Sequence, residues 1–255
     1  MLGKLIKNDM KNIGKLLLPL NVIVLLMTLV GIALRASRLF DLDNTTSLLV
    51  ILIMSYILGM IVIMVVSYFY PVIHFYRNLF TRQGYLTFTL PVSSWSILFS
   101  KTLVGFFWYI VTGVVATFSV WAITGFQRIP RETMAYLNHY FAQELGMNFA
   151  TFIGWLVVIT ISSLLWTLMT AYFSITVGQL YAKHKIIASV AVYVAVYTVM
   201  QVLITVALIP FIFRNPTQET IVSVALYSSV VFSLIFSPIF YGVSGIILKK
   251  KVNLD

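Results

Sequence analysis

The most suggestive group of residues for catalysis is a short glycine–serine motif near the C-terminus. Residues 242–245 read Gly-Val-Ser-Gly, a pattern in which Ser244 could act as a nucleophile. A serine nucleophile needs a base on a neighbouring element. Every histidine lies in a predicted loop or at the end of an apolar run: His74, His139 and His184. We therefore interpret the motif as a patch of small residues where helices pack closely, with catalysis by Ser244 as the alternative.

The chain lacks the other residue sets that commonly support chemistry. Cysteine is absent, so disulfides, thiol nucleophiles, iron–sulfur clusters and thiolate zinc sites are excluded. The Walker A pattern is also absent, because the two Gly-Lys pairs, at 3–4 and 14–15, are each followed by leucine. We expect no catalytic residue, no metal site and no cofactor on this chain, so hydrolysis of ATP would require another polypeptide.

Uncharged polar side chains form stripes along the last three apolar runs. They recur at steps of three or four residues, which keeps them on one face of a helix or on a slowly winding one. Two interpretations are open: hydroxyl groups that bond within or between packed helices, or the wall of a translocation path for an amphipathic substrate. The path candidates are Thr160, Ser163, Thr167, Thr170, Tyr193, Tyr197, Gln201, Ser229 and Ser233.

The elements that must position these residues are membrane-spanning helices. Of the 255 residues, 60% are hydrophobic and 9% are charged, whereas soluble domains carry about 25% charged residues. Six charge-free runs are each long enough to cross a bilayer as a helix. They predict an all-α membrane protein with a single transmembrane domain over residues 1–255, whose spans are 16–34, 48–72, 102–124, 149–177, 186–212 and 220–248.

The charges are divided unequally between the segments that connect these spans. The two terminal segments, the loop 74–101 and the loop between the fourth and fifth spans together carry 12 Lys or Arg and two Asp. The remaining loops carry five residues of each sign. An excess of Lys and Arg marks the cytoplasmic side, so we expect both termini in the cytoplasm. Topology and attraction to anionic membrane lipids account for the basic balance, and nucleic acid is not an expected partner.

Ionisable side chains are missing from the predicted spans, where no Asp, Glu, Lys, Arg or His occurs. Carriers driven by an ion gradient commonly keep such a group within the membrane. The pattern therefore argues against ion coupling, although backbone carbonyls can still bind an ion. The polar groups of the first span are only Asn21 and Thr28.

Two segments on the expected cytoplasmic side have the composition of interaction elements. Residues 1–15 repeat apolar residues and lysines at helical spacing, which predicts an interfacial helix that leads into the first span at Pro19. The loop 74–101 is rich in Tyr, Phe and Leu, and predicts a short helix that ends near Gly84. This helix would present Leu79, Phe80 and Tyr85 to a partner. The alternatives are a plain basic extension and a loop that packs on the chain's own spans.

The loop also carries a family resemblance. Residues 77–93, with Ser100 and Lys101 after them, resemble the first cytoplasmic loop of bacterial ABC-2-type transporter permeases. The resemblance implies a type V ABC exporter-like fold in the bacterial cytoplasmic membrane, with an interfacial helix, a coupling helix and a second copy or a related permease as dimer partner. It also implies a separate ATP-binding cassette subunit that holds ATP and Mg²⁺. The residues that would couple to this ATPase are Tyr76, Arg77, Leu79, Phe80, Arg82, Gln83, Gly84, Tyr85, Leu86 and Thr87.

The expected function is therefore that of the permease subunit of an ATP-driven exporter. In length and layout the chain is similar to the permeases of phenol-soluble-modulin exporters, and some members of this family export amphipathic peptide toxins. An antimicrobial peptide or a lipid-like molecule would also suit the polar stripes. The alternatives are a self-sufficient carrier or channel, and a membrane subunit that senses a ligand or confers immunity without transport.

Overall fold

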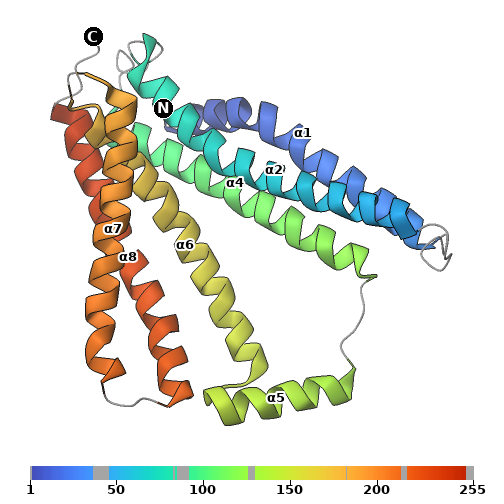
Figure 1. The fold of residues 1–255 in the computed structure, drawn as a ribbon. Helices are drawn as coiled ribbons and strands as arrows, with labels where there is room; N and C mark the ends of the chain where they lie inside the picture. The colour runs from blue at the N-terminus through green and yellow to red at the C-terminus, as the bar shows by residue number, and fades with distance from the viewer. Residues whose placement is uncertain are drawn as a thin grey trace. The chain divides into compact units, whose positions relative to one another are not determined.

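The computed structural model describes residues 2–36, 46–82, 84, 92–125, 130–181, 183–213 and 217–250. Within these ranges the chain forms seven α-helices and no β-strand (Figure 1). Six helices are long and apolar enough to cross a membrane, and they indicate a multi-pass membrane protein. They are α1 (Leu2–Ala36), α2 (Thr46–Phe80), α4 (Ser94–Ile123), α6 (Phe149–Gly178), α7 (Lys185–Ile212) and α8 (Gln218–Lys250).

The helices extend beyond several of the predicted spans. α1 is continuous from Leu2 to Ala36 and has Pro19 inside it, so the expected interfacial segment 1–15 is the first part of a longer helix. Thirty-five residues of helix measure about 52 Å, more than a hydrocarbon core of about 30 Å. α4 begins eight residues before its predicted span, where the Ser93 hydroxyl accepts a hydrogen bond from the backbone N–H of Ser96 at 3.2 Å.

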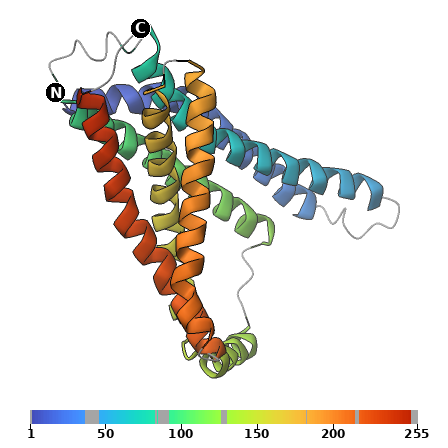
Figure 2. The same ribbon diagram turned by 60° about the vertical axis from the view of Figure 1, so that its left-hand side comes forward.

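The seventh helix, α5 (Arg131–Leu145), lies in the loop between α4 and α6 and has no buried residue. It ends at Gly146, whose positive φ of 63° lets its N–H bond back to the carbonyl of Phe141. Phe141 packs edge-on against Phe149 of α6, with ring centroids 5.2 Å apart. α5 contacts α6 and α8 near their ends (Figures 1 and 2).

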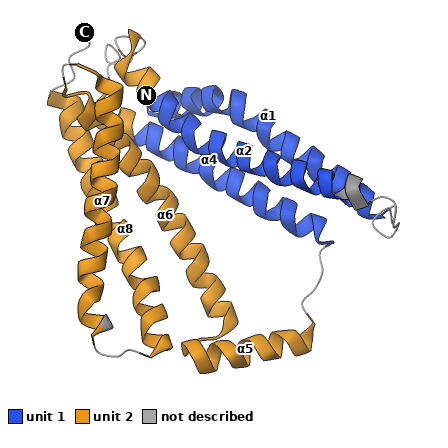
Figure 3. Ribbon diagram, viewed as in Figure 1, with its two compact units in different colours: residues 1–75, 99–128 blue, residues 76–98, 129–255 orange. Residues whose placement is uncertain are grey.

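The chain divides into two compact units, coloured separately in Figure 3. Unit 1 comprises residues 1–75 and 99–128, and contains α1, most of α2 and most of α4. Unit 2 comprises residues 76–98 and 129–255, and contains α5 to α8 together with the segment that connects α2 to α4.

Polar contacts at three levels join the helices of unit 1. Each α4 residue follows its α1 partner by 91 positions, so the two helices run parallel in constant register. α2 runs antiparallel to α4, because Tyr56 reaches Ser119 and Ser67 reaches Thr112. We call this set of contacts the polar seam. Its contacts between α1 and α4 are Asp9 with Ser100 at 2.7 Å, Asn21 with Thr112 at 3.3 Å, and Thr28 with Ser119.

The strongest contact of the polar seam is a buried ion pair. Lys101 donates to Oδ1 of Asp9 and Ser100 donates to Oδ2, so both carboxylate oxygens have partners. Asp9 and Lys101 are 1% and 2% exposed. Both residues lie outside the predicted spans, and their charges alone indicate only the membrane topology. The structure places them inside α1 and α4 and pairs them.

Asp9→Ala is expected to lower the free energy of unfolding by about 3–5 kcal/mol, because it leaves the Lys101 ammonium buried without its counter-charge. The double variant Asp9→Leu/Lys101→Met should recover most of this loss, since neither charge remains. Thermal unfolding of the purified protein in mild detergent measures both effects. Asn8→Ala, at an exposed position one residue away, is the matched control. Equal melting of Asp9→Ala and Asn8→Ala would contradict the assignment.

Unit 2 is held together mainly by ring packing and close helix approach. α6 contacts both α7 and α8, and α6 and α8 run parallel, because Trp155 packs on Tyr227 and Phe173 on Phe240. α7 turns back tightly against α6. A Cβ on Gly178 would lie 2.5 Å from the Cα of Ser189, so only glycine permits this approach.

Candidate functional site

A cavity of about 180 Å³ opens within the helix group of unit 2. Its surface is mostly apolar, with two aromatic rings and a methionine beside four serines, and small-molecule sites have this predominantly apolar lining with a few polar groups. Methionine and aromatic side chains adapt their packing to irregular apolar groups. The lining residues are Ile159, Ser162, Ser163 and Trp166 of α6, Met200 and Ile204 of α7, and Ser229, Phe232 and Ser233 of α8.

The serine hydroxyls of this cavity donate hydrogen bonds to the carbonyls of their own helices. Ser162 donates to Ile159 at 3.0 Å, and Ser233 donates to Val230 at 2.9 Å. Ser163 and Ser229 behave in the same way. The donor of each hydroxyl is therefore satisfied without a ligand, while each oxygen keeps acceptor capacity. Such a wall can accept hydrogen bonds from a passing molecule without a large desolvation cost.

The structure brings together three of the nine path candidates. Ser163, Ser229 and Ser233 line the cavity, whereas the other six do not. Among those six, Thr160, Thr167 and Thr170 donate to carbonyls of their own helix, and Tyr197 is 58% exposed on α7. The six candidates outside the cavity lining are Thr160, Thr167, Thr170, Tyr193, Tyr197 and Gln201.

The sequence prediction missed six of the nine lining residues, and five of these six are apolar residues that a selection of polar side chains passes over. Trp166, Met200 and Phe232 read as apolar residues that would face lipid. A useful signal was available in the neighbouring serines at 162 and 163, which place hydroxyls on two adjacent faces of α6.

The residues expected to couple to an ATPase are divided between the end of α2 and the segment after it. Arg77 and Arg82 are exposed, and Tyr76 and Phe80 are half-buried with their rings 6.3 Å apart. Leu79 is fully buried, whereas the sequence predicts that it is presented to a partner. Gly84 is buried and its N–H donates to the Thr81 carbonyl at 2.7 Å. Four further candidates, Gln83, Tyr85, Leu86 and Thr87, lie outside the described residues.

The first turn of α4, which follows the segment after α2, packs against α8 through Trp95. The Tyr241 hydroxyl donates to the Trp95 carbonyl at 3.2 Å, and the two rings lie 5.7 Å apart. A Cβ on Gly245 would lie 2.5 Å from Cε3 of the Trp95 indole ring. We call these three residues the Trp95 contact. It joins the start of α4 to α8, the helix that also carries Ser229, Phe232 and Ser233 of the cavity wall.

The Gly-Val-Ser-Gly motif forms part of this same contact. Gly245 makes the close approach to Trp95, whereas nothing lies within 4 Å of a Cβ placed on Gly242. Ser244 is 1% exposed, and its Oγ has no hydrogen-bond partner among the residues that the structure describes. The interpretation as a small-residue packing patch therefore fits Gly245 and does not extend to Gly242.

Comparison with known proteins adds no relative. No family model matches the chain, and neither a curated protein sequence nor a solved structure matches it.

Gly245→Ala is expected to lower the free energy of unfolding by about 1–3 kcal/mol, because the added methyl group would overlap the Trp95 ring. Gly242→Ala is the matched control and should be neutral or slightly stabilising, since its methyl group meets open space and alanine favours helix. Thermal unfolding in detergent compares the two. A destabilisation of the same size in both variants would show that helix backbone effects, and not the Trp95 contact, set the result.

Proposed function

We propose that the chain is the permease subunit of an ATP-driven exporter in the bacterial cytoplasmic membrane, with both termini in the cytoplasm. A separate ATP-binding cassette subunit would bind ATP and Mg²⁺, and a second copy or a related permease would complete the transporter. The substrate class is an amphipathic molecule, either a peptide or a lipid-like compound. The resemblance of residues 77–93 to the coupling loop of ABC-2-type permeases supports the family assignment.

The Trp95 contact is the observation that carries the proposal. A transporter of this kind must transmit movement from its cytoplasmic docking segment to the helices that enclose the substrate. Here the segment proposed to dock on the ATPase and the helices that line the cavity belong to one compact unit. Trp95 lies in the first turn of α4, which follows the docking segment, and it contacts Tyr241 and Gly245 of α8.

The proposed mechanism follows from this connection. Closure of the ATPase dimer on ATP would push the segment after α2, and the push would pass through the Trp95 ring into α8. Because Ser229, Phe232 and Ser233 lie on α8, a shift of this helix changes the width of the cavity. Hydroxyls that are already bonded to their own helices would let the substrate slide past without holding it tightly.

Arg77→Glu is expected to reduce co-purification of the ATPase subunit at least tenfold, because charge reversal at a docking surface opposes association. Arg131→Glu makes the same charge change on exposed α5, on the expected opposite side of the membrane, and should leave the complex intact. Gentle extraction with the native neighbours, followed by quantification of the bound subunit, tests both. Full retention of the ATPase by Arg77→Glu would argue against the docking assignment, and its absence from the wild-type preparation would overturn the proposal.

Ser229→Phe is expected to reduce ATP-dependent transport several-fold while the ATPase stays bound, because the ring would occupy the cavity. Ser228→Phe is the matched control: Ser228 is the neighbouring serine, donates in the same way to its own helix, and does not line the cavity. Transport of a fluorescent amphipathic peptide into inverted vesicles gives the readout. Equal transport by the two variants would remove the cavity from the path.

A further inference from the structure

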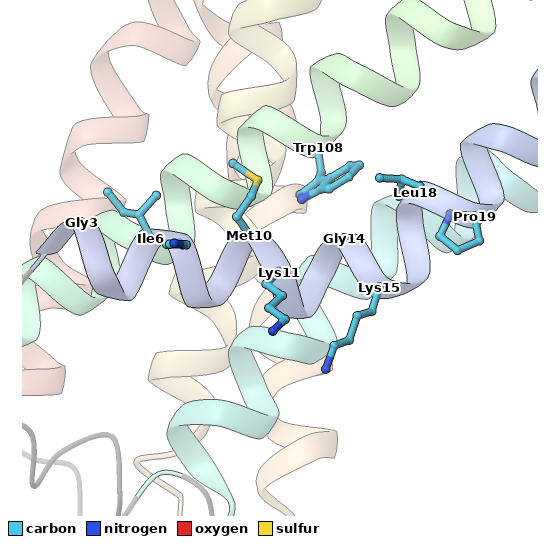
Figure 4. Close-up of a pocket in the computed structure, with 10 residues that line it drawn as sticks. Gly3, Ile6, Met10, Lys11, Gly14, Lys15, Leu18, Pro19 and Trp108 are labelled. Atoms are coloured by element: carbon cyan, nitrogen blue, oxygen red, sulfur yellow. The ribbon is translucent and has the colours of Figure 1, made fainter.

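We propose that unit 1 binds one anionic phospholipid in a groove along the first half of α1. The groove has a volume of about 810 Å³, within the range of small-molecule sites. Its apolar wall contains Ile6, Met10, Leu18 and Trp108. Three lysines also line it, and Figure 4 labels two of them, Lys11 and Lys15. This proposal of a bound lipid does not depend on the transport function proposed above.

The lysines supply the charge that selects the headgroup. Lys7, Lys11 and Lys15 are exposed and follow one another at steps of four, so they form a row about 12 Å long on one side of the groove. Asp9 is the one acidic residue in the described part of unit 1, and it is buried and paired with Lys101. The lysine row is therefore not neutralised, and each lysine near a membrane surface attracts anionic lipid.

The apolar wall supplies a place for an acyl chain. Gly14 has no side chain, and a Cβ there would lie 2.9 Å from the Trp108 ring, so glycine lets the indole lie directly against α1. Trp108 is 7% exposed, and its Nε1 has no hydrogen-bond partner among the described residues. In Figure 4 this nitrogen faces the flexible side chain of Met10. Movement of Met10 would open the N–H to an ester or phosphate oxygen.

The position of the groove on α1 favours a lipid over a soluble ligand. Lys7, Lys11 and Lys15 precede the charge-free run 16–34, whereas Leu18 and Pro19 belong to it. The groove thus crosses the boundary between the charged and the apolar parts of one helix. A headgroup beside the lysines and an acyl chain that runs past Trp108 toward Leu18 and Pro19 match this order along the helix axis.

The test is native mass spectrometry of the full chain, released from micelles that contain equal amounts of phosphatidylglycerol and phosphatidylcholine with identical acyl chains. One phosphatidylglycerol should be retained per chain. The variant Lys7→Gln/Lys11→Gln/Lys15→Gln should weaken its retention at least tenfold, and by about a hundredfold if the three surface attractions add. Leu18→Trp changes an exposed groove residue and should also displace the lipid, although the lysines remain.

The control variant Lys183→Gln/Lys249→Gln/Lys250→Gln removes the same charge from exposed positions outside the groove, and should keep the lipid. The proposal is overturned if both lipids are retained equally, or if this control loses as much phosphatidylglycerol as the groove variant. Unchanged retention by Leu18→Trp would also overturn it, since the binding would then be a general attraction to a basic surface. A dimer that Leu18→Trp dissociates would assign the groove to a second copy of the chain instead.

Discussion

The ion pair between Asp9 and Lys101 is the constraint on which the arrangement of unit 1 depends. A carboxylate and an ammonium removed from water are costly unless each lies opposite the other with its remaining hydrogen bonds made. This requirement fixes the register of α1 against α4 at one end. Because the two helices run parallel, the same offset brings Asn21 to Thr112 and Thr28 to Ser119. A slip of one turn would leave every level without its partner, so the polar seam specifies a single register that apolar packing alone would fix less strictly.

The helices of unit 2 are joined by different kinds of side chain from those that join the helices of unit 1. Its contacts between α6 and α8 are made by rings, and its closest approaches occur at Gly178 and Gly245. In α6 the hydroxyls of Thr160, Ser162, Ser163 and Thr167 donate to carbonyls of the same helix, so these bonds do not lock α6 to a neighbour. Helices joined by ring packing and glycine contacts can shift with fewer broken hydrogen bonds than helices joined by a buried ion pair. This difference suits unit 2 to the moving role proposed for it.

The sequence predicts the helices well because charge-free runs of this length are typical of membrane-spanning helices and rare elsewhere. The predicted runs 149–177, 186–212 and 220–248 lie within two residues of the ends of α6, α7 and α8. The first three helices are longer than predicted, since their ends are amphipathic and contain charges. α5 was not predicted because it is short and polar. The ion pair was also not predictable, because it joins residues 92 positions apart whose charges read equally well as markers of topology.

The same contacts that fix α1 also explain why its outer face is suited to a charged lipid. Pairing with Lys101 withdraws Asp9 from the surface, so the acidic residue closest to the lysines in sequence does not neutralise them. The parallel register brings Trp108 over Gly14, which supplies the wall of the groove. In isolation neither the basic repeat nor the tryptophan indicates a binding site, because basic repeats commonly mark topology and tryptophans commonly fill cores. The polar seam places Trp108 of α4 against the part of α1 that carries the lysines. Together they form a groove with a basic edge and an apolar wall.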